Sequence, residues 1–112
     1  MTAPRLNRRV VLEDRRRGPD GAGGWTETWQ ALGEMWAELR AGLGREKAQD
    51  FATISAVHFR VIVRGAPVGA PSRPVAGQRF RMGSRLFAIV GVAEADRAGR
   101  FLTCFAYEEA GT

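Results

Sequence analysis

Alternation of apolar and polar residues is the clearest pattern along the chain, and it is strongest in "AVHFRVIVR", residues 56–64. One face of this segment carries Val57, Phe59, Val61 and Val63, and the other carries His58, Arg60, Ile62 and Arg64. Successive side chains of a strand point to opposite faces, so a period of two predicts a β-strand with one apolar face.

Further strands are predicted on both sides of this segment. The first, "LNRRVVLEDR" over residues 6–15, is rich in β-branched residues and carries on one face Leu6, Arg8, Val10 and Leu12. A short strand around Phe80 and Met82 precedes a turn and a strand over residues 86–90, whose two apolar faces predict a central place in a sheet. The last strand, "RFLTCFAYEE", carries on one face Phe101, Thr103, Phe105 and Tyr107.

Residues 25–40 fit either strands or a helix. As a helix, they have an apolar stripe at spacings of three and four, made of Trp29, Leu32, Trp36, Leu39 and Leu43. Threonine and tryptophan favour a strand before Gly33, and each glycine would cost a continuous helix about 1 kcal/mol relative to alanine. The local pattern favours two strands, "WTETWQAL" and "EMWAEL", followed by a short helix or turn over "GREKAQDFA".

Two segments rich in glycine and proline separate the predicted strands. "RRGPDGAGG" has the composition of a chain reversal with a flexible tip. "GAPVGAPSRPVAGQ" contains three prolines and three glycines, which predict an irregular loop over residues 65–76. A loop of about a dozen residues is long for a compact domain, and such loops tend to be functional or mobile.

Length and composition indicate one globular domain over residues 1–112. The chain is 45% hydrophobic and 26% charged, which is ordinary for a folded protein. A chain of this size buries only about two-thirds of its unfolded surface, so oligomerisation would add stability.

The formal charge of +5 is compatible with binding close to a polyanion such as DNA, or it reflects an arginine excess from a GC-rich genome. Nearly all the basic residues are arginine, which favours bidentate contacts with phosphate or carboxylate.

The sequence lacks the usual signs of catalysis. Its single cysteine, Cys104, excludes an intramolecular disulfide or a multi-cysteine metal site and lies in an apolar strand, which predicts a small core residue. The single histidine, His58, lies within a strand, and no serine has the setting of an elbow nucleophile. We expect no enzyme activity, no cofactor and no metal. No apolar run reaches the ~18 residues of a membrane span and no signal peptide is recognisable, so synthesis in the cytoplasm without membrane association is expected.

In their order and spacing, these segments resemble the head-closure, or stopper, proteins of tailed bacteriophages and gene transfer agents. The resemblance runs through "LNRRVVLEDR", "DGAGGWTETW", "EMWAELRAGLGRE", "HFRVIVR" and "GSRLFAIVGVAEAD", covering nearly the whole chain. It implies an all-β, mainly antiparallel fold, a small β-barrel with a short helical element and long mobile loops. The Pro/Gly-rich segment 65–76 is longer than the resemblance leads us to expect.

The resemblance also implies a function in the neck of a phage or gene-transfer-agent particle. There the protein would form a homo-oligomeric ring of six or twelve subunits that seals the DNA-filled head and gives the tail a docking surface. The implied partners are portal and adaptor proteins on the head side, tail terminator and tail tube on the tail side, and double-stranded DNA in the channel.

Two groups of residues are candidates for such contacts. The first, flanked by the flexible Gly42 and Gly44, would line or close the channel, or would be a solvated connector with paired charges: Arg40, Arg45, Glu46 and Lys47. The second would contact another subunit or an acidic neighbouring ring: Arg15, Arg16, Arg17, Trp25 and Trp36. Alternatively, the three arginines solubilise a strand end. Of the tryptophans, Trp36 is expected in the barrel or at a subunit edge, and Trp25 exposed near the loop.

Two rival functions remain open from the sequence. One is a tail terminator of similar fold. The other is a free-standing nucleic-acid-binding barrel, in which Phe59, Phe80 or Trp29 would stack on single-stranded bases.

Overall fold

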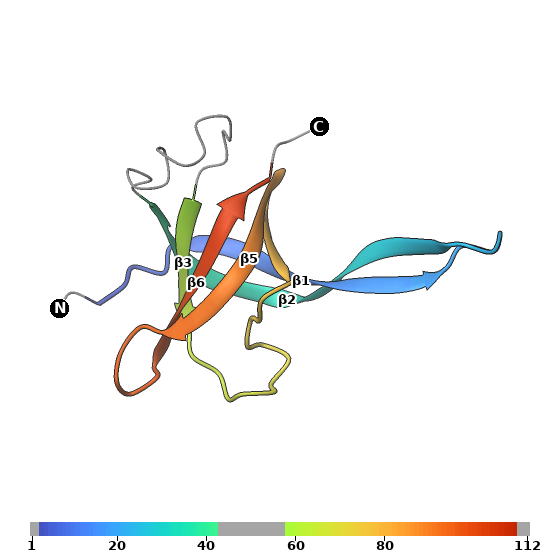
Figure 1. The fold of residues 1–112 in the computed structure, drawn as a ribbon. Helices are drawn as coiled ribbons and strands as arrows, with labels where there is room; N and C mark the ends of the chain where they lie inside the picture. The colour runs from blue at the N-terminus through green and yellow to red at the C-terminus, as the bar shows by residue number, and fades with distance from the viewer. Residues whose placement is uncertain (1–2, 43–57, 110–112) are drawn as a thin grey trace, which may run out of the picture.

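A computed structural model describes residues 3–42 and 58–109, which form a closed barrel of antiparallel strands (Figure 1). The strands are β1 (Arg8–Pro19), β2 (Trp25–Ala41), β3 (His58–Arg64), β4 (Arg79–Met82), β5 (Arg85–Glu94) and β6 (Phe101–Glu108). Their order around the barrel is β1-β2-β3-β6-β5-β4, and β4 closes it by pairing with β1. The all-β, antiparallel prediction is confirmed, and the helical element predicted over residues 44–52 lies outside the described residues.

The alternation along β3 sets the inside and outside of the barrel. Val61 and Val63 are fully buried, whereas His58, Arg60 and Arg64 are exposed, as the period of two predicts. The same rule holds along β6, where the buried residues Leu102, Cys104 and Ala106 alternate with the side chains that were predicted to share the other face.

The core fills the barrel with aliphatic and aromatic side chains from every strand. Its buried members are Val10, Leu12, Ala37, Val61, Val63, Phe80, Phe87, Ile89, Leu102, Cys104 and Ala106. Phe59 packs edge-on against Phe87, with ring centroids 5.1 Å apart. Burial of one large apolar side chain contributes about 1.5–3 kcal/mol, so this cluster is the main source of stability. The prediction that Cys104 is a core residue is confirmed.

Residues 25–40 form strand, and the two predicted strands are one. β2 runs through the expected break with a β-bulge, because Leu12 pairs with Gly33 while Glu13 pairs with Ala31. Gly33 has a φ of 156°, which a residue with a side chain rarely adopts. The glycine that argued against a helix therefore marks the place where an extra residue, Leu32, enters the strand.

β1 and β2 extend beyond the barrel as a two-stranded arm, which we define as residues 14–30 (Figure 1). Within the arm the two strands pair only with each other, because β4 pairs with residues 11–13 and β3 with residues 37–41. The molecule is 54 Å long and 37 by 23 Å across. At the far end, an Asp20 carboxylate oxygen accepts hydrogen bonds from the backbone N–H groups of Ala22 and Gly24, at 2.7 and 2.9 Å, and forms the predicted reversal.

The Pro/Gly-rich segment between β3 and β4 has no regular structure, as predicted, and it packs against the barrel. Pro74 is buried, and Arg73 donates a hydrogen bond of 2.8 Å to the carbonyl oxygen of Ala66. Backbone hydrogen bonds between Gly77 and Ile89 and between Gln78 and Ile89 attach its end to β5.

Candidate interaction surfaces

One face of the arm combines tryptophan with charged residues. Arg15 pairs with Trp29 and Arg17 pairs with Glu27, so strand alternation places these side chains and Trp25 on the same face. The guanidinium of Arg17 lies 5.8 Å from the ring centroid of Trp25, and Arg15 lies 3.6 Å from the Glu27 carboxylate. Trp25 is 66% exposed near the loop, as predicted.

The structure divides the predicted subunit-contact group between two places. Arg16 is on the opposite face of the arm from Arg15 and Arg17, 3.3 Å from Asp14. Trp36 is on the outer wall of the barrel rather than inside it; it is 50% exposed, and the Arg9 guanidinium lies 5.0 Å from its ring centroid. The arm therefore carries four of the five predicted residues, and Trp36 belongs to a separate surface.

The root of the arm is held by an ion-pair cluster that sequence reasoning missed. Glu13 is buried, and its two carboxylate oxygens accept hydrogen bonds from Arg79 at 2.7 Å and Arg81 at 2.8 Å. The Arg79 guanidinium also lies 4.0 Å from the ring centroid of Trp29. Gln78 donates a hydrogen bond of 3.3 Å to Asp14. Strands β1, β2 and β4 are thus joined where the arm leaves the barrel.

The cluster keeps Glu13 ionised. Burial raises the pKa of this carboxyl, but the hydrogen bonds from Arg81 and Arg79 lower it by more, so the pKa lies below its ordinary value. No local pattern indicated this pairing, because Glu13 and Arg79 are 66 positions apart in the sequence. The only available signal was a charged residue at the end of an apolar strand.

A groove crosses the outer wall formed by β2, β3 and β6. It encloses about 420 Å³ and is lined by Pro4, Arg40, Ile62, Ala95, Asp96, Phe101 and Thr103. Ile62 is only 4% exposed although strand alternation directs it outward, so it forms the apolar floor of the groove. Arg40 pairs directly with Arg60 on β3, and its Nε donates a hydrogen bond of 2.9 Å to Glu38.

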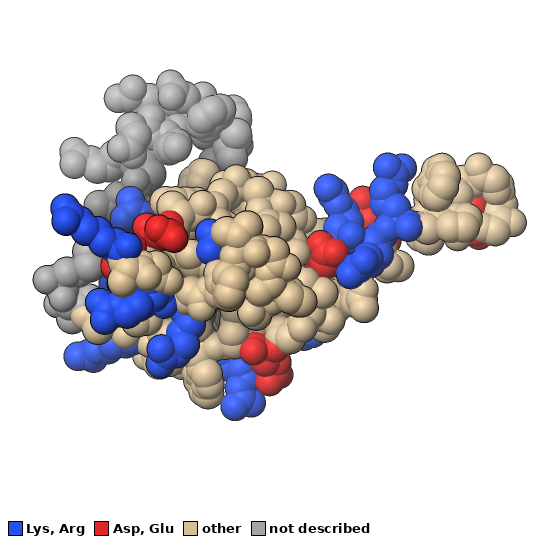
Figure 2. Space-filling view, turned by 90° about the horizontal axis from the view of Figure 1, so that it is seen from below, with Lys and Arg blue, Asp and Glu red and all other residues tan. Residues whose placement is uncertain are grey.

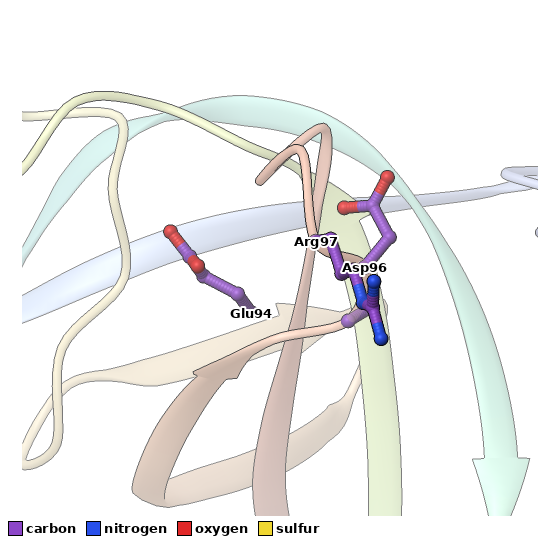
Figure 3. Close-up of a pocket in the computed structure, with 4 residues that line it drawn as sticks. Glu94, Asp96 and Arg97 are labelled. Atoms are coloured by element: carbon purple, nitrogen blue, oxygen red, sulfur yellow. The ribbon is translucent and has the colours of Figure 1, made fainter.

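The turn between β5 and β6 forms a shallow depression beside this groove (Figure 3). Its lining is Glu94, Ala95, Asp96 and Arg97. Figure 3 shows the Glu94 side chain directed away from Asp96, so the two carboxylates do not converge on one point. Asp96 instead binds Arg100, with an oxygen 3.0 Å from Nε, and accepts the Arg100 backbone N–H at 2.9 Å.

The single cysteine and the single histidine lie apart from these surfaces. Burial raises the pKa of the Cys104 thiol to about 12, so little thiolate forms at neutral pH. His58 is exposed at one end of the barrel, with its ring edge-on to Tyr107 at a centroid distance of 6.5 Å.

Within residues 3–42 and 58–109, no three His, Cys, Asp or Glu side chains gather in a way that could hold a metal ion. The same ranges contain no helix with the length and apolar character of a membrane span.

The predicted channel group is described only at its first member. Arg40 is exposed near the end of β2. Arg45, Glu46 and Lys47 lie outside the described residues.

Packing restricts the three residues that would stack on bases in the nucleic-acid-binding alternative. Phe80 is fully buried in the core, so its prediction as a base-stacking residue is wrong. Phe59 packs partly buried against the core, and Trp29 is covered on one side by Arg79.

The barrel has a packed interior, and its distinctive charged and aromatic groups are spread over an outer wall and a projecting arm. The chain belongs to the phage head completion protein family, whose model matches residues 1–110. The resemblance to phage and gene-transfer-agent head-closure proteins is confirmed, as is the expectation that the protein is a component of such a particle.

Two solved structures are similar to this chain. A chain in the virion of a native gene transfer agent particle is 55% identical, with a TM-score of 0.80 and coverage of 98% of this chain and 100% of that chain. Protein SF1141 from Shigella flexneri 2a is 21% identical, with a TM-score of 0.72 and full coverage of both chains, and this likeness concerns the fold alone. A search of curated proteins gave no match.

Proposed function

We propose that this protein forms a ring in the connector between the head and tail of a phage-like particle. The ring closes the DNA-filled head after packaging and presents the surface on which the tail docks. Its neighbours are portal or adaptor proteins on one side and the tail terminator or tail tube on the other.

The observation that carries this proposal is the likeness to the gene-transfer-agent virion chain. At 55% identity over 98% of this chain and a TM-score of 0.80, the two proteins share their fold and more than half of their aligned residues. The family name, phage head completion protein, supports the head-closing role over that of a tail terminator. It also supports a structural function over an enzymatic one.

The physical properties of the molecule agree with those expected of a subunit in a ring that surrounds DNA. A ring around DNA needs a rigid subunit, surfaces that contact other subunits, and a charge that tolerates phosphate. The packed barrel supplies rigidity, the arm and the outer wall supply exposed contact surfaces, and the formal charge is +5. Rings of six and twelve subunits both remain compatible with this arrangement.

Within the proposal, the segment that begins at Arg40 and continues through Arg45, Glu46 and Lys47 closes the channel. The basis is its sequence, in which Gly42 and Gly44 lie between Arg40 and Arg45 and allow the segment to swing. Charge reversal at Arg45 and Lys47 together is expected to release packaged DNA from assembled particles. DNA retention equal to that of unmodified particles would favour a solvated connector instead.

Electron microscopy of particles tests the proposal as a whole. Particles made without this protein are expected to show heads that lose DNA and carry no tail, and supplying the protein restores both. In complete particles, a label on this chain is expected at the junction of head and tail, as a ring. A label found along the tail, or intact tailed particles without the protein, would contradict the proposal.

A further inference from the structure

We infer that the tip of the arm of one copy docks in the wall groove of the adjacent copy, so that the ring is held together head to tail. The arm tip is residues 18–28, and the wall groove is the cavity on β2, β3 and β6 whose floor is Ile62. This inference rests on the proposed ring and specifies its subunit contact.

The arm has the properties of an element that requires a partner. Its two strands pair only with each other, and an isolated two-stranded hairpin is at best marginally stable in water. Trp25, near its end, is 66% exposed. Tryptophan is among the residues that contribute most to protein interfaces when it fills a pocket.

The charge of the arm changes along its length. Residues 18–28 contain Asp20 and Glu27 and no basic residue, whereas the three arginines lie at positions 15–17. Figure 2 shows this division: basic side chains gather at the base of the arm, and the projecting end carries only acidic and uncharged ones. The arm tip is therefore an apolar and acidic element.

The wall groove has the complementary character. Five arginines and three carboxylates lie in or beside it, a surplus of two positive charges: Arg40, Arg60, Arg64, Arg97 and Arg100, with Glu38, Glu94 and Asp96. Arg40 and Arg60 are direct cross-strand partners, and like charges in that position destabilise a sheet. Glu38 binds Arg40, but among the described residues no carboxylate forms an ion pair with Arg60, which leaves a place for an anion. An acidic tip with a tryptophan supplies both that anion and a group for the apolar floor.

The placement of the two surfaces determines the kind of assembly. Figure 1 shows the N-terminal segment and the β5–β6 turn, which border the groove, on the side of the barrel away from the arm. A tip cannot reach the groove of its own chain, so the contact is between different surfaces of two copies. Such a heterologous contact generates a ring when the rotation between neighbouring copies closes after a whole number of subunits. Six residues in each strand give the arm a length of about 20 Å, which is comparable with the width of four neighbouring strands in a sheet.

Engineered cysteines test the contact directly. Ala22→Cys places a thiol in the exposed tip, and Thr103→Cys places one in the groove. The buried Cys104, with its raised pKa, does not compete for oxidation. In oxidised particles, the double variant is expected to give a ladder of disulfide-linked oligomers that ends at the ring number, whereas each single variant stays monomeric on a non-reducing gel.

Charge exchange on the same double-cysteine background tests whether complementary charges hold the contact together. On the double-cysteine background, Glu27→Arg is expected to lower the cross-linked fraction at least tenfold, and adding Arg60→Glu is expected to restore it. Glu34→Arg is the matched control, because Glu34 is also exposed on β2 but belongs to the barrel and not to the arm tip. Its cross-linked fraction should remain unchanged.

The outcomes separate this inference from the function on which it rests. Particles that contain the protein at the neck but give neither a ladder nor charge-exchange rescue would overturn tip-in-groove docking and leave the proposed function intact. Dimers formed by Ala22→Cys alone would overturn it also, because they require two arms to meet. Absence of the protein from the neck would contradict the proposed function itself.

Discussion

At the scale of single residues, Glu13 is the side chain whose environment departs most from its sequence context. It lies on the outer side of the barrel wall, yet it is buried because Arg79 and Arg81 cover it. Removing one partner of a buried ion pair costs more than forming the pair gains, because the other charges then lose their compensation. The Glu13 cluster is therefore the part of the surface most sensitive to substitution.

Glu13→Gln is expected to lower the free energy of unfolding by about 3 kcal/mol at neutral pH, the range for breaking a buried ion pair. Urea denaturation followed by tryptophan fluorescence measures the change. Glu27→Gln is the control: its pair with Arg15 is exposed and 3.6 Å long, so the expected loss is at most about 0.5 kcal/mol. Equal effects of the two substitutions would show that burial of the Glu13 ion pairs does not increase their contribution to stability.

The same residue predicts a pH dependence. The folded-state pKa of Glu13 lies below its unfolded value of 4.5, so its contribution is fully present above that value and is lost as the pH falls through the folded pKa. Stability measured between neutral and acidic pH is expected to decline less steeply in Glu13→Gln than in the unmodified protein. Parallel curves for the two proteins would contradict the assigned ionisation.

At the scale of elements, alternation predicted the strands because barrel strands have one packed and one open face. Residues 58–64 illustrate this, since the inward valines and outward arginines follow from the period of two. The continuity of β2 could not be predicted, because a bulge at Gly33 shifts the alternation and resembles a break between two strands. The length of the arm could not be predicted either, because a strand that pairs on one side only has no sequence pattern that distinguishes it from a strand within the barrel.

The close approach of two loops leaves no room for a side chain at Gly65. A Cβ atom there would overlap the carbonyl oxygen of Gly99, and the Gly65 N–H donates a hydrogen bond of 2.7 Å to the Arg100 carbonyl. Gly65→Ala is expected to destabilise the protein by about 1–3 kcal/mol, as overpacking does. Gly18→Ala is the matched control, because nothing lies within 4 Å of the added methyl group. Thermal denaturation of both variants measures the difference, and an unchanged melting temperature for Gly65→Ala would contradict this contact.

The stacking of Trp29 on Arg79 at the root of the arm is expected to stabilise the attachment of the arm to the barrel. Trp29→Ala removes the ring that lies 4.0 Å from the Arg79 guanidinium and leaves the barrel core untouched. Amide hydrogen exchange in residues 14–30 is expected to accelerate several-fold, while exchange in β3 and β6 stays the same. Trp36→Ala, which removes an exposed tryptophan elsewhere, should leave exchange in the arm unchanged. Uniform acceleration across the whole chain would indicate global destabilisation instead.

At the scale of the whole molecule, the sequence indicated the family and the barrel but not the distribution of charge. The formal charge of +5 says only that basic residues are in excess. Folding brings Arg40 beside Arg60 and leaves the arm tip acidic, and both facts depend on strand register. The proposed subunit contact therefore could not be derived before the register was known, and neither could the separation of Trp36 from the arm residues.

The charge distribution also predicts how the isolated protein behaves towards nucleic acid. With Phe80 buried and Phe59 packed against the core, binding rests on arginine contacts to phosphate and not on base stacking. Single- and double-stranded oligonucleotides are therefore expected to bind weakly and with similar affinity, and to be released as salt rises towards about 0.2 M. Arg60→Ala with Arg64→Ala should reduce the slope of log affinity against log salt concentration by about 2, whereas Phe59→Leu should leave it unchanged. Tight, salt-resistant binding of single strands that Phe59→Leu abolishes would instead establish a base-stacking protein, because only an aromatic platform gives affinity that survives the screening of phosphate charge.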